Sequence, residues 1–344
     1  MGVNFRALAP KTKIDFTSLS GKSVAIDAYN ALYQFLAIIR QPDGTPLKDR
    51  SGRITSHLSG LFYRTVNLVE KGVKVAYVFD GAPPTLKEVE IKRRAKVKAE
   101  ALVKYEKALK EGKIEQARSY AQMTSKLKDY MPEDSKRLLT ELGVPWIQAP
   151  SEGEAQAAYL TLKGAADYCG SQDYDSLLFG ATALVRNVTI SGRRKLPRKR
   201  VYVEVVPEVM KLEHVLRELE ITREQLIDVA MLVGTDFNPD GVKGIGPKTA
   251  LKLIRKHGSI EEALNELEDA EFPVEPKRIR EIFLKPKVTD DYQLEWTDPN
   301  VEGVVDFLCR ERDFSEDRVR RALSKMTAGL KEAKSKRTLE SWFC

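Results

Sequence analysis

Hydrophobic and polar positions along the first half of the chain predict strands that are each followed by a helix. Strand-like apolar runs lie within four stretches: 23–30, 73–81, 143–155 and 166–180. Helical patterns fill four others: 28–39, 55–71, 133–142 and 153–163. Apolar strands that alternate with helices are typical of parallel sheets, so we predict an α/β fold with a mostly parallel central sheet flanked by helices.

Two further stretches are predicted to be helical. From about residue 207 onward the pattern is helical throughout, and residues 222–237 form a helix with one apolar face. Residues 85–130 are helix-prone, with a break expected near Gly112, and carry thirteen Lys and Arg against seven Asp and Glu. This basic stretch is either a solvated helical pair or a helical arch that holds nucleic-acid phosphates.

Composition limits the classes of site that the chain can carry. The 344 residues are 42% hydrophobic, which is ample for one large domain with an added module, and no apolar run is long enough for a membrane span. Three scattered cysteines favour a reducing, intracellular compartment, and three separated histidines argue against a zinc site. The net charge of +7 agrees with a nucleic-acid partner without requiring one.

Seven acidic residues stand where such a sheet would bring them together. Six end or follow the predicted strands, and the seventh ends the helix of 222–237: Asp27, Asp80, Glu152, Glu154, Asp173, Asp175 and Asp236. Ligands of parallel sheets bind beyond the carboxyl ends of the strands. Any one acid could be a turn residue or a helix cap, but all of them together would repel one another unless a cation neutralised them. Carboxylate ligands suit Mg²⁺ or Mn²⁺.

The stretch "APSEGEAQAAYL" (149–160) allows two interpretations. Ser151 and Glu154 have the spacing of a capping box, in which each side chain bonds a backbone N–H at the start of a helix. Alternatively, Glu152 and Glu154 both face a metal ion, and Gly153 between them permits a close approach of backbone or ligand. If Glu154 faces a metal, it cannot also bond the N–H of Ser151.

Two motifs in the second half of the chain suggest binding. The turn in "GVKGIGPKTALKLIRKHG" (241–258) presents free backbone N–H groups at a helix start, with Lys248 and Lys252 nearby, and such turns bind phosphate. The end of the chain, "KSKRTLESWFC", carries Leu339, Trp342 and Phe343 beside basic residues. This apolar triplet is either a small helix docked on the protein itself or a partner-binding peptide.

Together these residues resemble the flap endonuclease family of structure-specific 5′ nucleases, in its archaeal form, over essentially the whole chain. The resemblance rests on these motifs: "MGV", "AIDAYNALYQFL", "TSHLSGLFYRT", "YVFDGAPPTLK", "APSEGEAQAAYL", "GSQDYDSLLFG", "LVGTDF", "GVKGIGPKTAL" and "TLESWF". It implies a PIN-like 5′ nuclease fold in four parts. These are a nuclease core (1–83 and 132–206), a basic helical arch (84–131), a helical DNA-binding region (207–330) with a helix–two-turn–helix motif at about 222–258, and a flexible tail (331–344).

The resemblance also implies roles for individual residues. The seven acids above match the family's metal ligands, with the first four nearer one ion and the last three nearer a second. Lys87 and Arg94 match its catalytic basic residues, and Tyr33 matches a tyrosine that stacks near the scissile nucleotide. DNA contacts are implied at eight positions: Gly2, Arg40, Arg64, Gly241, Gly244, Gly246, Lys248 and Lys252.

The implied function is Mg²⁺-dependent cleavage of 5′-flapped DNA near the junction by two metal ions, with 5′–3′ exonuclease activity, in Okazaki-fragment processing and base excision repair. Mn²⁺ is expected to substitute, and a K⁺ is implied at the glycine turn. Leu339, Trp342 and Phe343 match a peptide that binds the sliding clamp (PCNA), although Lys336 stands where glutamine is usual.

We expect a monomer in the cytoplasm, associated with the nucleoid. The alternatives are a 5′ exonuclease, a bubble or junction nuclease of the same superfamily, or a non-catalytic clamp adaptor.

Overall fold

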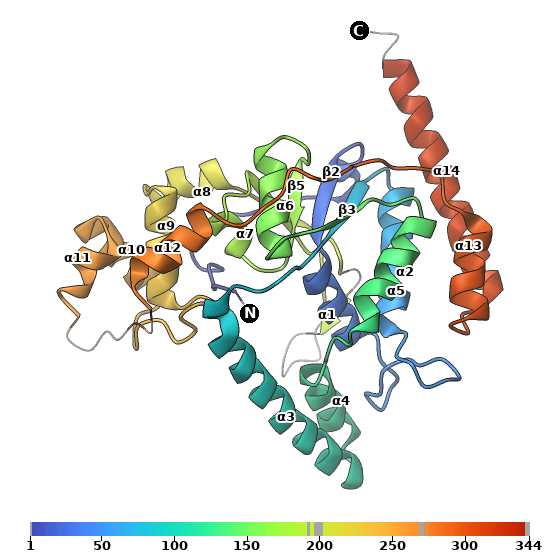
Figure 1. The fold of residues 1–344 in the computed structure, drawn as a ribbon, viewed down its shortest axis with the longest axis horizontal. Coiled ribbons are helices and arrows are strands. Elements are labelled where there is room, and N and C mark those ends of the chain that lie inside the picture. The colour runs from blue at the N-terminus through green and yellow to red at the C-terminus, as the bar shows by residue number, and fades with distance from the viewer. Residues whose placement is uncertain (1, 191–192, 196–201, 268–271, 273, 341–344) are drawn as a thin grey trace.

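A computed structural model of the chain describes residues 2–190, 193–195, 202–267, 272 and 274–340. In Figure 1 a central sheet lies between layers of helices, a helical pair projects from one side, and a long C-terminal helix extends from the opposite side. In the described part of the chain, no helix is both long and apolar enough to cross a membrane.

Seven strands form the central sheet in the order β1-β9-β6-β5-β2-β3-β4. Their bounds are Thr12–Lys13 (β1), Ser23–Asp27 (β2), Lys74–Phe79 (β3), Trp146–Gln148 (β4), Tyr168–Gly170 (β5), Ala183–Arg186 (β6) and Glu208–Lys211 (β9). Strands β4, β3, β2, β5 and β6 are parallel neighbours, whereas β9 runs antiparallel to β6 and β1. The predicted mostly parallel α/β sheet is therefore confirmed.

Alternate residues of the central strands feed two hydrophobic clusters, one on each face of the sheet. Val24 and Ile26 of β2 belong to one cluster, and Ala25 between them belongs to the other. The first cluster packs against four helices: α1 (Ala28–Ile38), α2 (Ser56–Glu70), α5 (Tyr130–Glu141) and α14 (Glu316–Glu340). The second packs against α6 (Gly153–Leu162), α7 (Asp175–Leu178) and α9 (Arg223–Val233). Because both faces are covered, the strands read as continuous apolar runs.

The basic stretch forms the projecting helical pair, α3 (Glu88–Lys110) and α4 (Ile114–Met123), which is preceded by a short turn at Thr85–Lys87 (Figure 1). The predicted break is confirmed, since Gly112 turns the chain with φ +68°. The two helices meet through small side chains: Ala101 and Ala108 of α3, and Ala117 and Ala121 of α4, are buried. The pair therefore has only a thin apolar seam and exposes most of its charged residues.

The prediction that the chain is helical throughout from residue 207 is wrong at residues 208–211. These residues form β9, in which Val209 and Met210 are buried against the sheet. A four-residue strand is too short to show a period of its own, and here it is stabilised by pairing with β6. The helices that follow are α8 (Leu212–Leu219), α9, α10 (Pro247–His257), α11 (Ile260–Leu264) and α12 (Pro276–Leu284).

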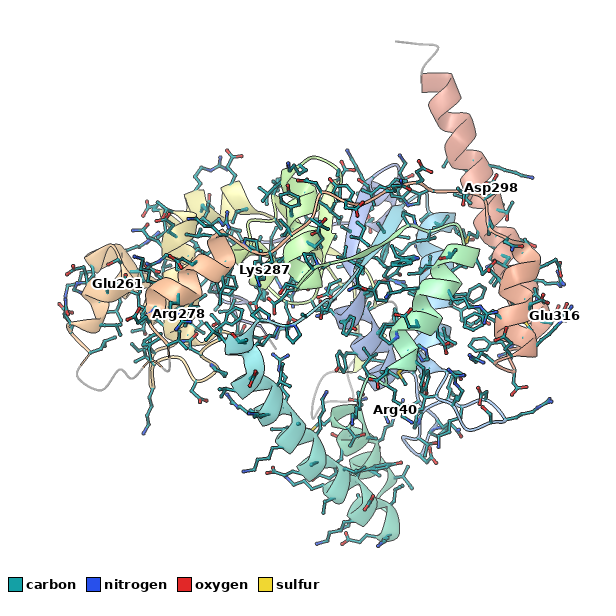
Figure 2. All side chains as sticks on the ribbon, viewed as in Figure 1. Arg40, Glu261, Arg278, Lys287, Asp298 and Glu316 are labelled. Carbon is teal, nitrogen blue, oxygen red and sulfur yellow. The ribbon has the colours of Figure 1, made fainter. Side chains whose placement is uncertain are left out.

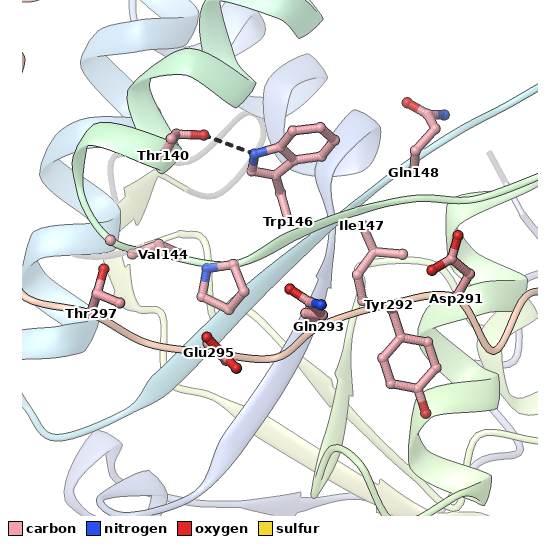
Figure 3. A pocket seen from close by; sticks show the side chains of 12 residues that line it. Thr140, Val144, Trp146, Ile147, Gln148, Asp291, Tyr292, Gln293, Glu295 and Thr297 are labelled. Carbon is pink, nitrogen blue, oxygen red and sulfur yellow. Dashed lines mark hydrogen bonds between the residues drawn. The ribbon is translucent and has the colours of Figure 1, made fainter.

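Residues 285–300, which we call the strap, contain no helix or strand and cross from α12 to the far side of the sheet (Figure 1). Gln156 holds the strap through two hydrogen bonds with the backbone of Thr289, at 2.8 and 2.9 Å. Further along, the indole N–H of Trp296 donates to the carbonyl of Val75 in β3 at 2.7 Å. Figure 3 shows the groove between the strap and the edge strand β4, lined by Trp146 among other side chains.

The last helices return to the sheet and α2. Helix α13 (Val301–Val305) and the π-helical turn Asp306–Arg310 lead into α14, which packs on α2. The predicted DNA-binding region 207–330 thus consists of two groups of helices, α8–α12 and α13–α14, which pack in different hydrophobic clusters and are joined by the strap. The outer boundaries of the region stay a prediction. The backbone of α14 is helical to Glu340, which includes Leu339 and most of the segment predicted to be a flexible tail. Trp342 and Phe343 lie outside the described residues.

Candidate active site

The seven acids come together at the carboxyl edge of the sheet, as their positions after the strands predict. Strand β2 ends at Asp27, Asp80 follows β3, and Asp173 follows β5. Each member interacts electrostatically with another: Asp27 with Asp80 and Asp173, Asp80 with Glu152, Glu154 with Asp175, and Asp175 with Asp236. We call these seven residues the acidic cluster.

Burial and mutual repulsion disfavour ionisation of several members of the acidic cluster. Burial, with a smaller contribution from neighbouring carboxylates, raises the pKa of Asp80 to about 6 and that of Asp175 to about 7. The same two causes raise the pKa values of Asp27 and Glu154 well above their ordinary range. A buried set of carboxylates that resists ionisation is stabilised by any cation that enters it.

Two basic side chains at the start of α3 neutralise part of the acidic cluster. Lys87 forms ion pairs with Glu152 and with Asp236, the latter at 3.0 Å, and Arg94 pairs with Asp236. Although burial acts to raise it, the pKa of Asp236 is held below its ordinary value by Lys87 and Arg94. Arg94 is itself oriented by Glu90, one helical turn away, at 2.8 Å. The site therefore places cations directly beside the carboxylates.

The capping-box interpretation of "APSEGEAQAAYL" is wrong. Helix α6 begins at Gly153 without a side-chain cap, and the Ser151 hydroxyl donates to the carbonyl of Ala82 instead. Glu154 turns into the acidic cluster, where one carboxylate oxygen accepts from the backbone N–H and the hydroxyl of Ser176, at 3.0 and 2.5 Å. Both helix-start acids therefore face the acidic cluster.

Gly153 and Gly2 allow backbone to approach the carboxylates closely. The N–H of Gly153 donates to Asp80 at 2.6 Å, and a Cβ at this position would lie 2.8 Å from the same oxygen. Likewise, a Cβ on Gly2 would lie 2.5 Å from one carboxylate oxygen of Asp175, and the other oxygen accepts from the N–H of Val3 at 2.8 Å. Gly2 is thus in contact with the acidic cluster, where the family resemblance implies that it should be.

A cavity of about 710 Å³ opens beneath α3, beside the acidic cluster. Asp80, Glu152, Lys87 and Arg94 line one end of it, and Tyr33 lines its floor. Tyr33 is 37% exposed, and the ammonium of Lys98 lies 4.5 Å from its ring centroid. The cavity thus combines an aromatic surface with basic groups, which are the features that hold single-stranded nucleic acid.

The two arginines predicted to contact duplex are both engaged inside the protein. Arg40, labelled in Figure 2 near α4, donates to the carbonyls of Leu36 and Gly44 and to the Ser125 hydroxyl at 3.0 Å. Arg64 is 7% exposed and donates to the backbone carbonyls of Val188 and Ile190. Arg40 is half-buried and ties the 40–46 loop to the segment that follows α4, whereas Arg64 has little surface to offer a ligand.

The predicted phosphate-binding turn lies apart from the acidic cluster, at the start of α10. Gly241 and Gly244 have positive φ, and Gly246 immediately precedes Pro247 as the residue before the helix. Lys248 and Lys252 are exposed on α10. The N–H groups at the helix start and these two ammonium groups form a surface suited to a phosphate.

The described side chains include no set of three or more Asp, Glu, His or Cys that is already arranged to hold a metal ion. Lys87, Arg94 and backbone N–H groups occupy the carboxylate oxygens instead. The chemistry of the donors nonetheless fits a divalent ion, because the site is a buried group of carboxylates with raised pKa values, and oxygen ligands suit Mg²⁺ and Mn²⁺. The seven-ligand assignment stays a prediction.

Two polar residues of the site were not anticipated from the sequence. Ser176 binds Glu154, and Asn30 donates to Asp173 at 3.0 Å. Asn30 ends the stretch 23–30, and its position three residues after Asp27 is the one feature of the sequence that could have indicated a role in the site. Ser176 directly follows Asp175, but no local pattern distinguishes it from an ordinary helix residue.

Comparison with known proteins relates both the sequence and the fold to structure-specific nucleases. Residues 4–101 match the XPG N-terminal domain, and residues 143–236 match the XPG I-region. Flap endonuclease 1 of Staphylothermus marinus is 55% identical over 349 residues, which covers 100% of both chains. The structure of flap endonuclease-1 from Methanococcus jannaschii has a TM-score of 0.75 and 43% identity, and the alignment covers 96% of this chain and 99% of that one. The Holliday junction-resolving enzyme GEN1, solved with product DNA, Mg²⁺ and Mn²⁺, shares the fold at a TM-score of 0.60 and 16% identity, over 94% of this chain and 76% of that one.

Proposed function

This chain belongs to the flap endonuclease family of XPG-type nucleases, and we propose that its acidic cluster holds the divalent ions with which it hydrolyses branched DNA. The protein is a structure-specific 5′ flap endonuclease, a hydrolase that cleaves DNA phosphodiester bonds in replication and repair. The observation that carries the metal assignment is the convergence of seven carboxylates, four with raised pKa values, at one edge of the sheet.

The seven carboxylates would hold two ions, which is the number that a phosphodiester displacement uses on its attacking and leaving oxygens. When bound, such ions would supply an activated water molecule and positive charge near the departing 3′ oxygen. The protein's own contribution is a rigid set of oxygens. Asp80 and Asp175 are held by backbone N–H groups of Gly153 and Val3, and Glu154 is held by Ser176.

Lys87 and Arg94 would exchange their carboxylate partners for the scissile phosphate. Both side chains pair with Asp236, and both line the cavity beneath α3. The scissile phosphate would supply the negative charge that these two groups pair with, and they would stabilise the charge of the transition state. Tyr33 on the cavity floor would stack on a base next to the scissile bond.

Binding of the duplex would depend on surfaces away from the chemistry. The turn before α10, with Lys248 and Lys252, would hold a backbone phosphate together with a K⁺ ion, and Arg40 would help to shape the 40–46 loop beside the upstream duplex. Leu339, Trp342 and Phe343 would anchor the protein, as a monomer, to the sliding clamp PCNA. These assignments rest on the sequence motifs, since Trp342 and Phe343 lie outside the described residues.

Cleavage assays on branched DNA test this function directly. Single-turnover rates on 5′-flap, nicked, bubble and four-way substrates, with EDTA and then added Mg²⁺, should rank the flap first and show complete dependence on the metal. A higher rate on bubbles or four-way junctions would assign the chain to another branch of the superfamily. Binding of flap DNA without cleavage at any Mg²⁺ concentration would support a non-catalytic adaptor instead.

A further inference from the structure

Asn30 is hydrogen-bonded to two members of the acidic cluster at once. Its backbone N–H donates to Asp27 at 2.9 Å, and its side-chain amide nitrogen donates to Asp173 at 3.0 Å. Asp27 ends β2 and Asp173 follows β5, so one residue of α1 joins carboxylates from two neighbouring strands. In the described part of the chain, Asn30 provides the one hydrogen bond that reaches the side chain of Asp173.

The orientation of the Asn30 amide is determined by its surroundings. The amide oxygen accepts from the side-chain nitrogen of Gln34 at 2.7 Å and from the backbone N–H of Gln172 at 3.3 Å. A flipped amide would place its NH₂ group against both donors, so the nitrogen must face Asp173. The donor that Asp173 receives is therefore fixed in direction.

The orientation of the Gln34 amide follows from that of Asn30. Because the Asn30 oxygen can only accept, the side-chain nitrogen of Gln34 donates to it one helical turn away, and the Gln34 oxygen accepts from the hydroxyl of Thr189, a residue outside α1, at 2.8 Å. Thr189, Gln34, Asn30 and Asp173 thus form a directed chain of hydrogen bonds, which we call the relay. Each donor in the relay has an acceptor in the next member.

The far end of the relay is anchored by a buried arginine. Arg64 donates to the carbonyls of Val188 and Ile190, at 2.5 and 2.7 Å, which are the residues on either side of Thr189. Arg64 is 7% exposed, and it belongs to α2 in the core. The guanidinium therefore holds the backbone from which the Thr189 hydroxyl projects toward Gln34.

The carboxylate of Asp173 lies among other carboxylates that repel it. It repels Asp27, Glu154 and Asp175, so without a donor its carboxylate would turn away from the other members of the acidic cluster. We infer that Asn30, oriented by Gln34 and Thr189, is a positioning residue that holds the Asp173 carboxylate in the direction needed to bind a divalent ion. This inference rests on the proposed metal-binding function of the acidic cluster.

Mn²⁺ binding to the full-length, metal-free protein tests the relay without depending on turnover. Partners that orient metal ligands typically change metal affinity by about 10- to 100-fold when they are removed. We expect Asn30→Leu to weaken Mn²⁺ binding, measured from the paramagnetic resonance signal of free Mn²⁺, by at least about 10-fold. The half-saturating Mg²⁺ concentration for cleavage should rise in parallel, and high Mg²⁺ should restore much of the rate.

Thr189 supplies a matched pair of variants at a distance from the carboxylates. Thr189→Val removes the hydroxyl with little change of shape and should weaken Mn²⁺ binding, whereas Thr189→Ser retains the hydroxyl and should bind like the parent. If the effect travels through Asn30, Thr189→Val should add no further loss to Asn30→Leu. This pair also decides the question if Asn30→Leu fails to fold.

The outcomes separate the relay from the metal site itself. Mn²⁺ affinity unchanged in both Asn30→Leu and Thr189→Val would overturn the relay while leaving the metal site intact. Equal losses in Thr189→Ser and Thr189→Val would also overturn it, since the hydroxyl would then be irrelevant. A parent protein that binds no Mn²⁺ would refute the proposed metal site.

Discussion

We predict that His57 lowers the unfolding free energy of this protein as the pH falls, and that replacing His57 abolishes this part of the pH dependence. Its imidazole is fully buried near the start of α2, and neither ring nitrogen has a hydrogen-bond partner among the described residues. Burial, with the nearby charges of Arg312 and Arg53, lowers the pKa of His57 to about 3. Folding therefore requires the neutral imidazole, whereas the unfolded chain takes up a proton near pH 6.5.

The sign and size of the effect follow from proton linkage. Because the pKa of His57 is lower in the folded state, the unfolded state binds more protons between about pH 6.5 and 3, and stability declines as the pH falls through that window. Between pH 7.5 and 5.0 the loss from this one group amounts to about 2 kcal/mol. His57→Leu has a similar volume and no proton to bind, so it should lack this part of the decline.

Urea unfolding of the parent and of His57→Leu at pH 7.5, 6.5, 5.5 and 5.0 measures the effect. The difference in unfolding free energy between the two proteins should shift by about 2 kcal/mol in favour of the variant across this range, whatever the fixed cost of the substitution. His214→Leu, which removes a partly exposed imidazole, controls for the loss of a histidine. Parallel pH curves for the parent and His57→Leu would refute the reasoning.

Three other predictions concern the acidic cluster and the DNA surface. Asp175→Asn should bind flap DNA like the parent but cleave it more than about 100-fold more slowly in single-turnover assays, and parental cleavage would remove Asp175 from the metal ligands. Gly153→Ala places a methyl group 2.8 Å from an oxygen of Asp80 and from the carbonyl of Val78, so urea unfolding should show a loss of about 1–3 kcal/mol together with slower cleavage. Affinity for flap DNA should fall steeply between about 50 and 200 mM salt in fluorescence titrations, and a flat response would contradict binding through phosphates.

Much of the central sheet could be predicted from the sequence because its main strands are buried on both faces. Such strands are continuous apolar runs, and the helices after them have wide apolar faces, so α1 and α2 begin and end within about a residue of the predicted limits. Strands β6 and β9 escaped prediction because each has only four residues and is stabilised by the other. Their paired residues lie 22 to 28 positions apart in the chain, and no local period reveals such a contact.

The acidic cluster was predictable for a similar reason, while its supporting contacts were not. Residues that follow parallel strands must meet at one edge of the sheet. The positions of Asp27, Asp80 and Asp173 after three such strands therefore predict that these acids lie together. The pairing of Lys87 with Asp236 depends on the angle at which α3 leaves the sheet. The burial of Arg64 depends on a loop more than 120 residues further along the chain. Such contacts are decided by tertiary packing, which local sequence does not encode.

The packing of α14 against α2 has a consequence for the order in which the protein can fold as it is synthesised. Phe307, Leu308, Val319, Leu323 and Met326 are buried in the cluster built around α2, and a Cβ on Gly329 would lie 2.6 Å from the backbone of Glu70. The strap delivers these residues only after almost the whole chain has left the ribosome. The part of α2 that α14 covers, made among the first seventy residues, therefore stays uncovered during most of translation. The nascent protein has to keep that face from aggregating until its last helix arrives.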